Sequence, residues 1–167
     1  MLLMNSFKYD VDVIIEIPLN TFIKYEYDNN FKGIRCDRVL NTSMIYPGNY
    51  GYIPNTVAGD GDPLDALVIC DYALMPGCII KCKIIGVLLT KDEKGDDEKL
   101  ILVPHSTIDK NYSDIDTIEN LPSSLLIKIK HFFTHYKDNE PSKFVCVDDY
   151  KDRDIALEIL RLSKVVK

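Results

Sequence analysis

The first half of the chain consists of short apolar runs separated by turn-forming residues, and this pattern constrains the fold most strongly. From residue 11 to residue 82, β-branched and aromatic residues recur in brief stretches that glycine, proline, asparagine and aspartate interrupt. Such runs are typical of strands in an antiparallel sheet or a barrel. We predict strands at residues 11–17, 22–27, 33–39, 66–70, 79–89 and 99–103.

The last third of the chain changes to a helical period. After Pro122, apolar residues recur at intervals of three and four up to Tyr136, which predicts an amphipathic helix, and residues 152–165 fit a second one. Residues 46–55 hold two prolines and two glycines, so we predict a rigid, aromatic-lined loop there rather than a central strand or a helix. The expected architecture is a small barrel with carboxy-terminal helices packed on it.

Length and charge exclude several classes of protein. A chain of 167 residues fits one domain spanning residues 1–167, and its net charge of -6 disfavours a nucleic-acid partner. The longest apolar runs are far shorter than the roughly 20 residues that cross a bilayer, so no membrane partner is expected. Residues 1–5 lack an export signal, and five cysteines without paired spacing indicate a reducing compartment. We therefore expect a cytoplasmic protein.

The densest chemical signal is an acidic hexapeptide at residues 60–65, Asp60-Gly61-Asp62-Pro63-Leu64-Asp65. Carboxylates held this close raise one another's pKa unless a cation compensates, and a divalent ion is one such cation. The calcium-loop pattern fails because Leu64 stands where an oxygen ligand is required. The hexapeptide alone leaves a solvated acidic turn and a metal site equally open.

A second acidic loop, residues 92–99, connects two predicted strands and by itself fits an ordinary charged hairpin turn. Loops at one end of a small barrel converge on a common mouth, so the two acidic segments could bind the same cluster of metal ions. Lys24, Arg38 and Lys137 lie in apolar surroundings, and each fits a surface cation when taken singly. Together with metal-binding carboxylates, they provide what a multiply charged phosphate needs.

These segments resemble the family I soluble inorganic pyrophosphatases of bacteria, nearly end to end. The hexapeptide is similar to that family's Asp-Gly-Asp-Pro-hydrophobic-Asp motif. Further matching segments occur in the same order as in the family, at residues 15–18, 23–26, 37–38, 46–52, 92–99, 103–106 and 131–137. The resemblance implies an α+β, mainly β fold with an OB-like closed β-barrel and flanking carboxy-terminal helices. It also implies an enzyme that uses several Mg²⁺ ions to hydrolyse inorganic pyrophosphate to two orthophosphates by direct attack of a metal-activated water.

The resemblance further implies roles for individual residues. Asp62 would be the catalytic base that takes the proton of the attacking water, and Glu16 would orient metal-bound water from the outer shell. The metal ligands would be Asp60, Asp65, Asp97, Asp92 and Glu26. The substrate-binding residues would be Lys24, Arg38, Tyr50, Lys99, Tyr136 and Lys137. It also implies a homohexamer in which the helix end carrying His131 and His135 meets a neighbouring subunit, although an exposed histidine pair is equally compatible with the spacing.

Two other functions compete with this interpretation. An OB-like barrel also serves as a module that binds single-stranded nucleic acid through aromatic side chains and a basic groove, against which the acidic loops argue. A nucleotide hydrolase that uses the same metal ions is harder to separate, because the sequence does not reveal how tightly the pocket closes around the distal phosphate.

Overall fold

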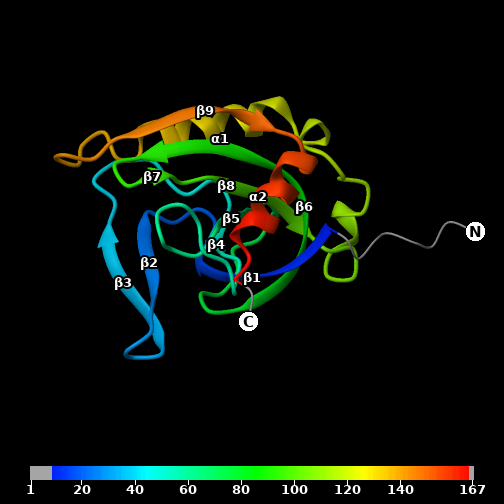
Figure 1. Cartoon of the computed structure of the whole chain (residues 1–167), viewed down its shortest axis with the longest axis horizontal. Helices are drawn as coiled ribbons and strands as arrows, with labels where there is room; N and C mark the ends of the chain where they lie inside the picture. Colours follow the sequence, from blue (N-terminus) through cyan, green and yellow to red (C-terminus); the bar gives the residue numbers. More distant parts are fainter. Residues whose placement is uncertain (1–8, 166–167) are drawn as a thin grey trace, which may run out of the picture.

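The computed structural model describes residues 9–165 and is mainly β, with two carboxy-terminal helices (Figure 1). Residues 1–5, on which the export-signal expectation rests, lie outside the described residues. The strands are β1 Asp10–Ile17, β2 Ile23–Asp28, β3 Gly33–Val39, β4 Asn49–Tyr52, β5 Asp65–Val68, β6 Ile79–Asp92, β7 Gly95–Asp96, β8 Lys99–Pro104 and β9 Val145–Lys151. The helices are α1 Ser123–His135 and α2 Arg153–Ser163.

Five strands close into a ring in the order β1, β4, β5, β8, β6 and back to β1. All neighbours in this ring are antiparallel except β5 and β8, which run parallel. The ring confirms the expected closed barrel. The long strand β6 extends beyond it and also pairs with β7 and β9, while β2 and β3 form a separate two-stranded hairpin at the left of Figure 1.

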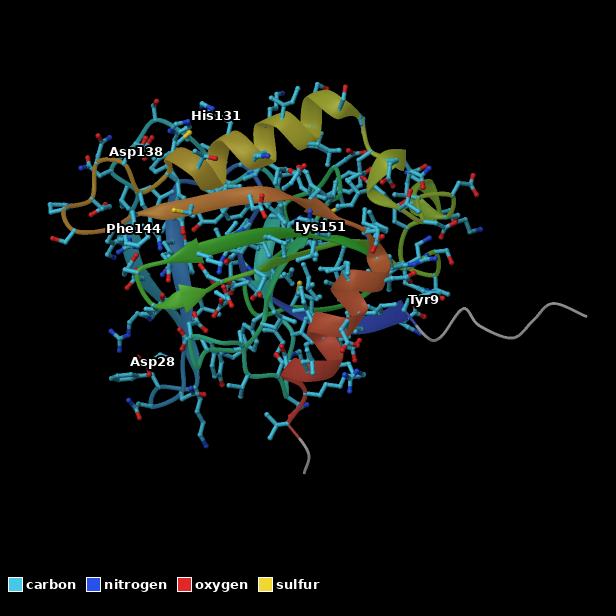
Figure 2. All side chains as sticks on the ribbon, turned by 45° about the horizontal axis from the view of Figure 1, so that its top comes forward. Tyr9, Asp28, His131, Asp138, Phe144 and Lys151 are labelled. Carbon is cyan, nitrogen blue, oxygen red and sulfur yellow. The ribbon has the colours of Figure 1, made fainter. Side chains whose placement is uncertain are left out.

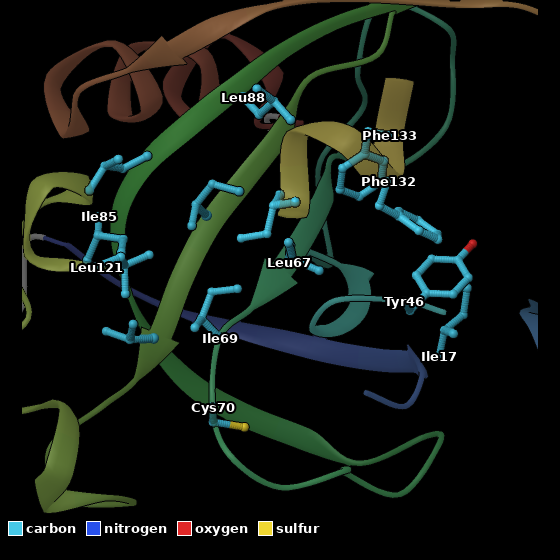
Figure 3. Packing of buried hydrophobic residues seen from close by; sticks show 14 of the residues in the cluster. Ile17, Tyr46, Leu67, Ile69, Cys70, Ile85, Leu88, Leu121, Phe132 and Phe133 are labelled. Carbon is cyan, nitrogen blue, oxygen red and sulfur yellow. The ribbon is translucent and has the colours of Figure 1, made fainter. Parts of the chain in front are cut away.

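Side chains of the ring alternate between two apolar clusters because successive residues of a strand point to opposite faces. In β8, Leu100 and Leu102 pack in the cluster that contains Ala156 and Leu160 of α2. Residues between and beside them, such as Ile101, join the cluster that contains three buried residues of α1, Ile129, Phe132 and Phe133. Figure 3 shows the second cluster, with Phe132 and Phe133 next to Tyr46. Both helices therefore cover the ring with apolar faces, as the helical period predicts.

The expectation of a loop throughout residues 46–55 is wrong for β4, which pairs with β1 on one side and β5 on the other. The prolines Pro47 and Pro54 lie outside the strand, so they remove none of its ladder hydrogen bonds. Gly51 allows the strand to approach β1 closely, since a Cβ atom there would lie 1.9 Å from the carbonyl oxygen of Ile14. The glycine that argued against a strand is thus what lets the strand fit.

The remaining differences from expectation are local. The strand β9 was not predicted, because all of its residues are exposed or half-buried and its apolar alternation is weak. The helix α2 begins one residue later than expected, after Asp152, whose carboxylate accepts a hydrogen bond from the Ile155 N–H at 3.0 Å. All five cysteines, each in the described range, are free thiols. Among residues 9–165, no helix has the length and apolarity to span a bilayer.

Candidate active site

One cavity of about 600 Å³ collects the residues that the sequence singled out. Its walls come from the hairpin β2–β3, the acidic hexapeptide, the β6–β8 connection and the end of α1. All the predicted site residues line it. They are the predicted base Asp62, the outer-shell residue Glu16, the metal ligands Asp60, Asp65, Asp97, Asp92 and Glu26, and the substrate-binding residues Lys24, Arg38, Tyr50, Lys99, Tyr136 and Lys137. Segments far apart in the sequence thus present opposite charges to one space.

The inner wall of the cavity is built around the buried Lys99. The parallel register of β5 and β8 sets Asp65 opposite Lys99, whose Nζ lies 2.5 Å from Asp65 Oδ2 and 2.6 Å from Asp97 Oδ1. Burial disfavours the charged ammonium, but the two carboxylates outweigh it and raise the pKa of Lys99. This lysine is therefore a fixed positive charge that holds two carboxylates together.

Asp97, one of the two carboxylates beside Lys99, is perturbed by its buried position. Burial raises the pKa of Asp97, and the nearby negative charge of Asp65 adds to this, although Lys99 acts in the opposite direction. Burial also raises the pKa of the phenols of Tyr50 and Tyr136 well above its ordinary value. Both phenols consequently keep their protons and can donate hydrogen bonds to an anion in the cavity.

A second buried pair joins the end of β6 to the end of α1. Lys137 Nζ donates to Asp92 Oδ2 at 3.1 Å, and the Lys94 backbone N–H donates to Asp92 Oδ1 at 2.8 Å. Burial alone would raise the pKa of Asp92, yet these hydrogen bonds and the positive charges of Lys137 and Lys99 outweigh burial and lower it. Asp92 is therefore held as a carboxylate.

The hairpin β2–β3 supplies the opposite wall. Its register sets Lys24 opposite Arg38. Lys24 pairs with Glu26, two residues along the same strand face, and lies 3.7 Å from Asp37 Oδ2. The Nε of Arg38 is buried and donates no hydrogen bond to any residue of the described range, although Asp37 Oδ2 lies 3.7 Å away. Arg38 thus retains a donor for a further acceptor.

Glu16 ties the hairpin to the ring. It lies in β1, and its Oε1 accepts a hydrogen bond from the Tyr27 N–H of β2 at 2.8 Å. Burial raises the pKa of Glu16 to about 7, and the charges of Asp65 and Glu26 contribute in the same direction. The carboxyl group of Glu16 therefore exchanges a proton near neutral pH at the edge of the cavity.

The acidic hexapeptide forms the mouth of the cavity. Gly61 adopts a φ of 89°, a left-handed conformation that glycine tolerates best, and the Asp62 N–H donates to Asp60 Oδ1 at 3.0 Å. This tight turn leaves the Asp62 side chain exposed, with Oδ2 at 3.5 Å from Lys94 Nζ. Asp60 and Asp62 are thus presented to the cavity by an Asx-type turn rather than by a regular strand.

Within residues 9–165, no three His, Cys, Asp or Glu side chains converge tightly enough to hold a metal ion as they stand. Lysine ammonium groups lie between the candidate ligands instead. Lys99 spans Asp65 and Asp97, Lys94 faces Asp62, and further lysines pair with Glu26 and Asp92. The carboxylates are crowded enough to need positive charge, and here lysines provide it.

Sequence reasoning missed several residues that line the cavity. Lys94 and Lys143 are the cations among them, and Glu93 is a further carboxylate. Lys94 belongs to the acidic loop at residues 92–99, where a lysine in a turn fits an ordinary solvated side chain. Lys143 lies beyond α1 in a polar segment without periodicity. The one available signal for Lys94 was that its loop was expected to converge with the acidic hexapeptide.

Comparison with known proteins identifies the family. The sequence profile described as inorganic pyrophosphatase matches residues 13–165. The chain is 49% identical to the inorganic pyrophosphatase of Campylobacter jejuni, over 94% of this chain and 90% of that protein. It is 48% identical to that of Saccharolobus solfataricus, over 95% and 91%.

Solved structures agree with the sequence comparison. The inorganic pyrophosphatase of Helicobacter pylori superposes with a TM-score of 0.91 at 42% identity, covering 97% of this chain and 95% of that one. The enzyme of Thermus thermophilus superposes with a TM-score of 0.90 at 40% identity, covering 98% and 94%. With its closed strand ring, its charged cavity and these relatives, the chain belongs to the inorganic pyrophosphatase family, a family of hydrolases.

Proposed function

We propose that this chain hydrolyses inorganic pyrophosphate to two orthophosphates, with Mg²⁺ as its cofactor and water as the direct attacking group. The observation that carries the proposal is that carboxylates of two acidic loops face lysines, an arginine and protonated phenols across one cavity. Pyrophosphate is a small, highly charged anion, and lysine and arginine form strong charge-assisted hydrogen bonds with phosphate oxygens. Membership of the family points to the same reaction.

The side chains of the cavity suit Mg²⁺. Asp60, Asp65 and Asp97 offer oxygen donors, which Mg²⁺ prefers, and Asp92 and Glu26 add two more at the margins. The raised pKa of Asp97 reflects burial and crowding with Asp65, a strain that a divalent cation relieves. When bound, Mg²⁺ supplies positive charge that screens the phosphates and lowers the pKa of coordinated water.

The substrate is held by cations and phenols. Lys24 and Arg38 approach from the hairpin, with the free Nε donor of Arg38 available to a phosphoryl oxygen. Lys137 approaches from the end of α1, and Lys99 from the inner wall. The hydroxyl groups of Tyr50 and Tyr136 donate hydrogen bonds as neutral phenols. These contacts orient the substrate.

Asp62 is the proposed catalytic base. Its carboxylate is exposed at the mouth of the cavity, where a water molecule can reach it, and it accepts the proton as the water oxygen bonds to phosphorus. The bridging P–O bond breaks, and Arg38 and Lys137 stabilise the negative charge that the leaving phosphate gains. Glu16 orients water from the outer shell through its hydrogen-bonded carboxyl group.

Phosphate release from pyrophosphate tests this proposal. The purified chain is expected to release two phosphates per substrate with Mg²⁺, to lose activity on chelation with EDTA, and to recover it when Mg²⁺ is restored in excess. Full activity of the chelated protein would contradict the metal requirement. A salt-sensitive gel shift with oligonucleotides, without phosphate release, would favour a nucleic-acid-binding module instead.

We also propose that residues 1–167 act as one domain in a cytoplasmic homohexamer. The histidines at the end of α1 are exposed in the single chain, and Figure 2 labels His131 and Asp138 in this part of the molecule. His135 Nδ1 lies 2.8 Å from Asp138 Oδ2. Exposed apolar side chains on the same molecule, such as Ile127 at 69% and Phe144 at 53%, supply surface that assembly would bury. Sedimentation equilibrium tests the proposal, because a monomer at micromolar concentration would contradict it.

A further inference from the structure

Lys94 lies where the two acidic loops meet. It occupies the turn between β6 and β7, and its backbone N–H donates to Asp92 Oδ1 at 2.8 Å. Its side chain extends across the mouth of the cavity, where Nζ lies 3.5 Å from Asp62 Oδ2. One residue therefore touches an aspartate of each acidic loop, through its backbone on one side and its ammonium group on the other.

The charge of Lys94 is directed at carboxylates that serve the proposed function. The carboxylate of Asp62 raises the pKa of the Lys94 ammonium, and those of Asp60 and Asp92 raise it further. The same three residues line the cavity. The ammonium group thus occupies the region of negative potential that attracts a divalent cation to the mouth.

Exposure separates Lys94 from the lysine of the inner wall. The Lys99 side chain is 3% exposed and held between two carboxylates, whereas the Lys94 side chain is 60% exposed and its partner Asp62 is 65% exposed. Exposed ion pairs contribute little stability, and their long side chains retain rotational freedom. Lys94 can therefore leave Asp62 for solvent at little cost, while Lys99 cannot leave its site.

We propose that Lys94 is a built-in cationic competitor at the mouth of the cavity, which weakens the binding of divalent metal ions beside Asp60 and Asp62. An arriving cation must displace the ammonium group or bind against its repulsion. Lys94 thereby raises the Mg²⁺ concentration at which the mouth is filled. The inference rests on the metal ligands of the proposed function, but not on the reaction itself.

Direct Mg²⁺ binding to the metal-free, full-length protein tests the inference, measured by isothermal titration calorimetry. Lys94→Ala removes the ammonium group and keeps the backbone N–H that bonds Asp92. Its expected effect is a Kd for Mg²⁺ lower by about threefold to tenfold, the size of a surface Coulomb interaction with a doubly charged ion. Lys94→Arg retains the charge and is expected to stay within about twofold of the parent.

Lys91→Ala is the matched control. Lys91 lies in the same hairpin, pairs with Asp96 at 3.0 Å and does not line the cavity, so this change removes an equal charge from the same region. Its Kd is expected to stay within about twofold of the parent. The effect of Lys94→Ala should also shrink between about 0.01 M and about 1 M salt, as the Debye length falls from about 30 Å to about 3 Å.

An unchanged or weaker Kd in Lys94→Ala would overturn the inference, as would an equal gain in Lys91→Ala. A higher KM for pyrophosphate with no change in Mg²⁺ affinity would assign Lys94 to the substrate instead. A parent protein that binds no Mg²⁺ would also overturn it. Phosphate release, measured separately, decides the reaction: binding without hydrolysis would end the proposed function and leave the Lys94 result standing.

Discussion

Lys99 and Lys94 both pair with an aspartate of the acidic hexapeptide, Lys99 with Asp65 and Lys94 with Asp62. The first pair is in the inner wall of the cavity and is joined there by Asp97, whereas the second pair is at the exposed mouth. Removing one partner of a buried pair leaves a charge without compensation, but water replaces a lost partner at the surface. The same type of lysine–aspartate pair is therefore expected to stabilise the fold in the wall and to affect Mg²⁺ binding at the mouth.

The largest expected difference between the two regions appears when each lysine is replaced by methionine. Lys99→Met leaves Asp65 and Asp97 side by side without their cation, so we expect a loss of about 3–5 kcal/mol in the free energy of unfolding. Lys94→Met is expected to change it by no more than about 0.5 kcal/mol. Urea unfolding of the metal-free proteins measures both, and similar losses would remove the distinction between wall and mouth.

The aspartates of the hexapeptide extend the comparison of wall and mouth to catalytic activity. Asp62→Asn removes the proposed base at the mouth and should lower turnover by about 10²–10⁴-fold, with Mg²⁺ binding closer to intact. Asp65→Asn removes a proposed ligand in the wall, so its defect should be relieved in part by high Mg²⁺. Turnover against Mg²⁺ concentration distinguishes them. Complete rescue of both variants would show that the two roles are wrongly assigned.

A smaller effect is expected from Glu16, which lies at the edge between wall and mouth. Its pKa in the folded protein is about 7, above the ordinary 4.5, so the folded state binds this proton more tightly than the unfolded state does. The stability that Glu16 contributes is complete below pH 4.5 and is lost as pH rises to about 7. The largest loss is about 3 kcal/mol.

Glu16→Gln tests this pH dependence because glutamine does not titrate. The free energy of unfolding of the metal-free variant, relative to the parent, should increase as pH rises from 4.5 to about 7 and then level off. Comparing the two proteins cancels the contributions of other titrating groups. A constant difference across that range would show that burial does not shift the pKa of Glu16.

The fold was predictable where local patterns and packing agree. The alternation in β1 and the helical spacing of α1 correspond to buried faces, and the continuous apolar run of β8 corresponds to a strand buried on both faces. The strand β4 was missed because its glycine and flanking prolines resemble a loop, and only the close approach to Ile14 explains Gly51. The strand β9 was missed because it lies on the outer part of β6 and buries few side chains.

The site was predictable as a set of residues but not as a geometry. The motifs named the side chains that line the cavity, yet only the parallel register of β5 and β8 shows that Lys99 spans Asp65 and Asp97. Lys94 carried no local signal, because its importance comes from the approach of Asp62 across the mouth. Long-range pairing of this kind cannot be derived from spacing within one loop.

The most direct test of the account is the rate of phosphate release from pyrophosphate compared with ATP, under the same Mg²⁺ concentration. Lys24, Arg38, Lys137 and Lys99 line the cavity, and our proposal assigns these cations to the two phosphates of pyrophosphate and none of them to a nucleoside. We predict that pyrophosphate is hydrolysed at least about a hundredfold faster than ATP. Equal rates, or faster release from ATP, would contradict the assignment of this cavity to pyrophosphate.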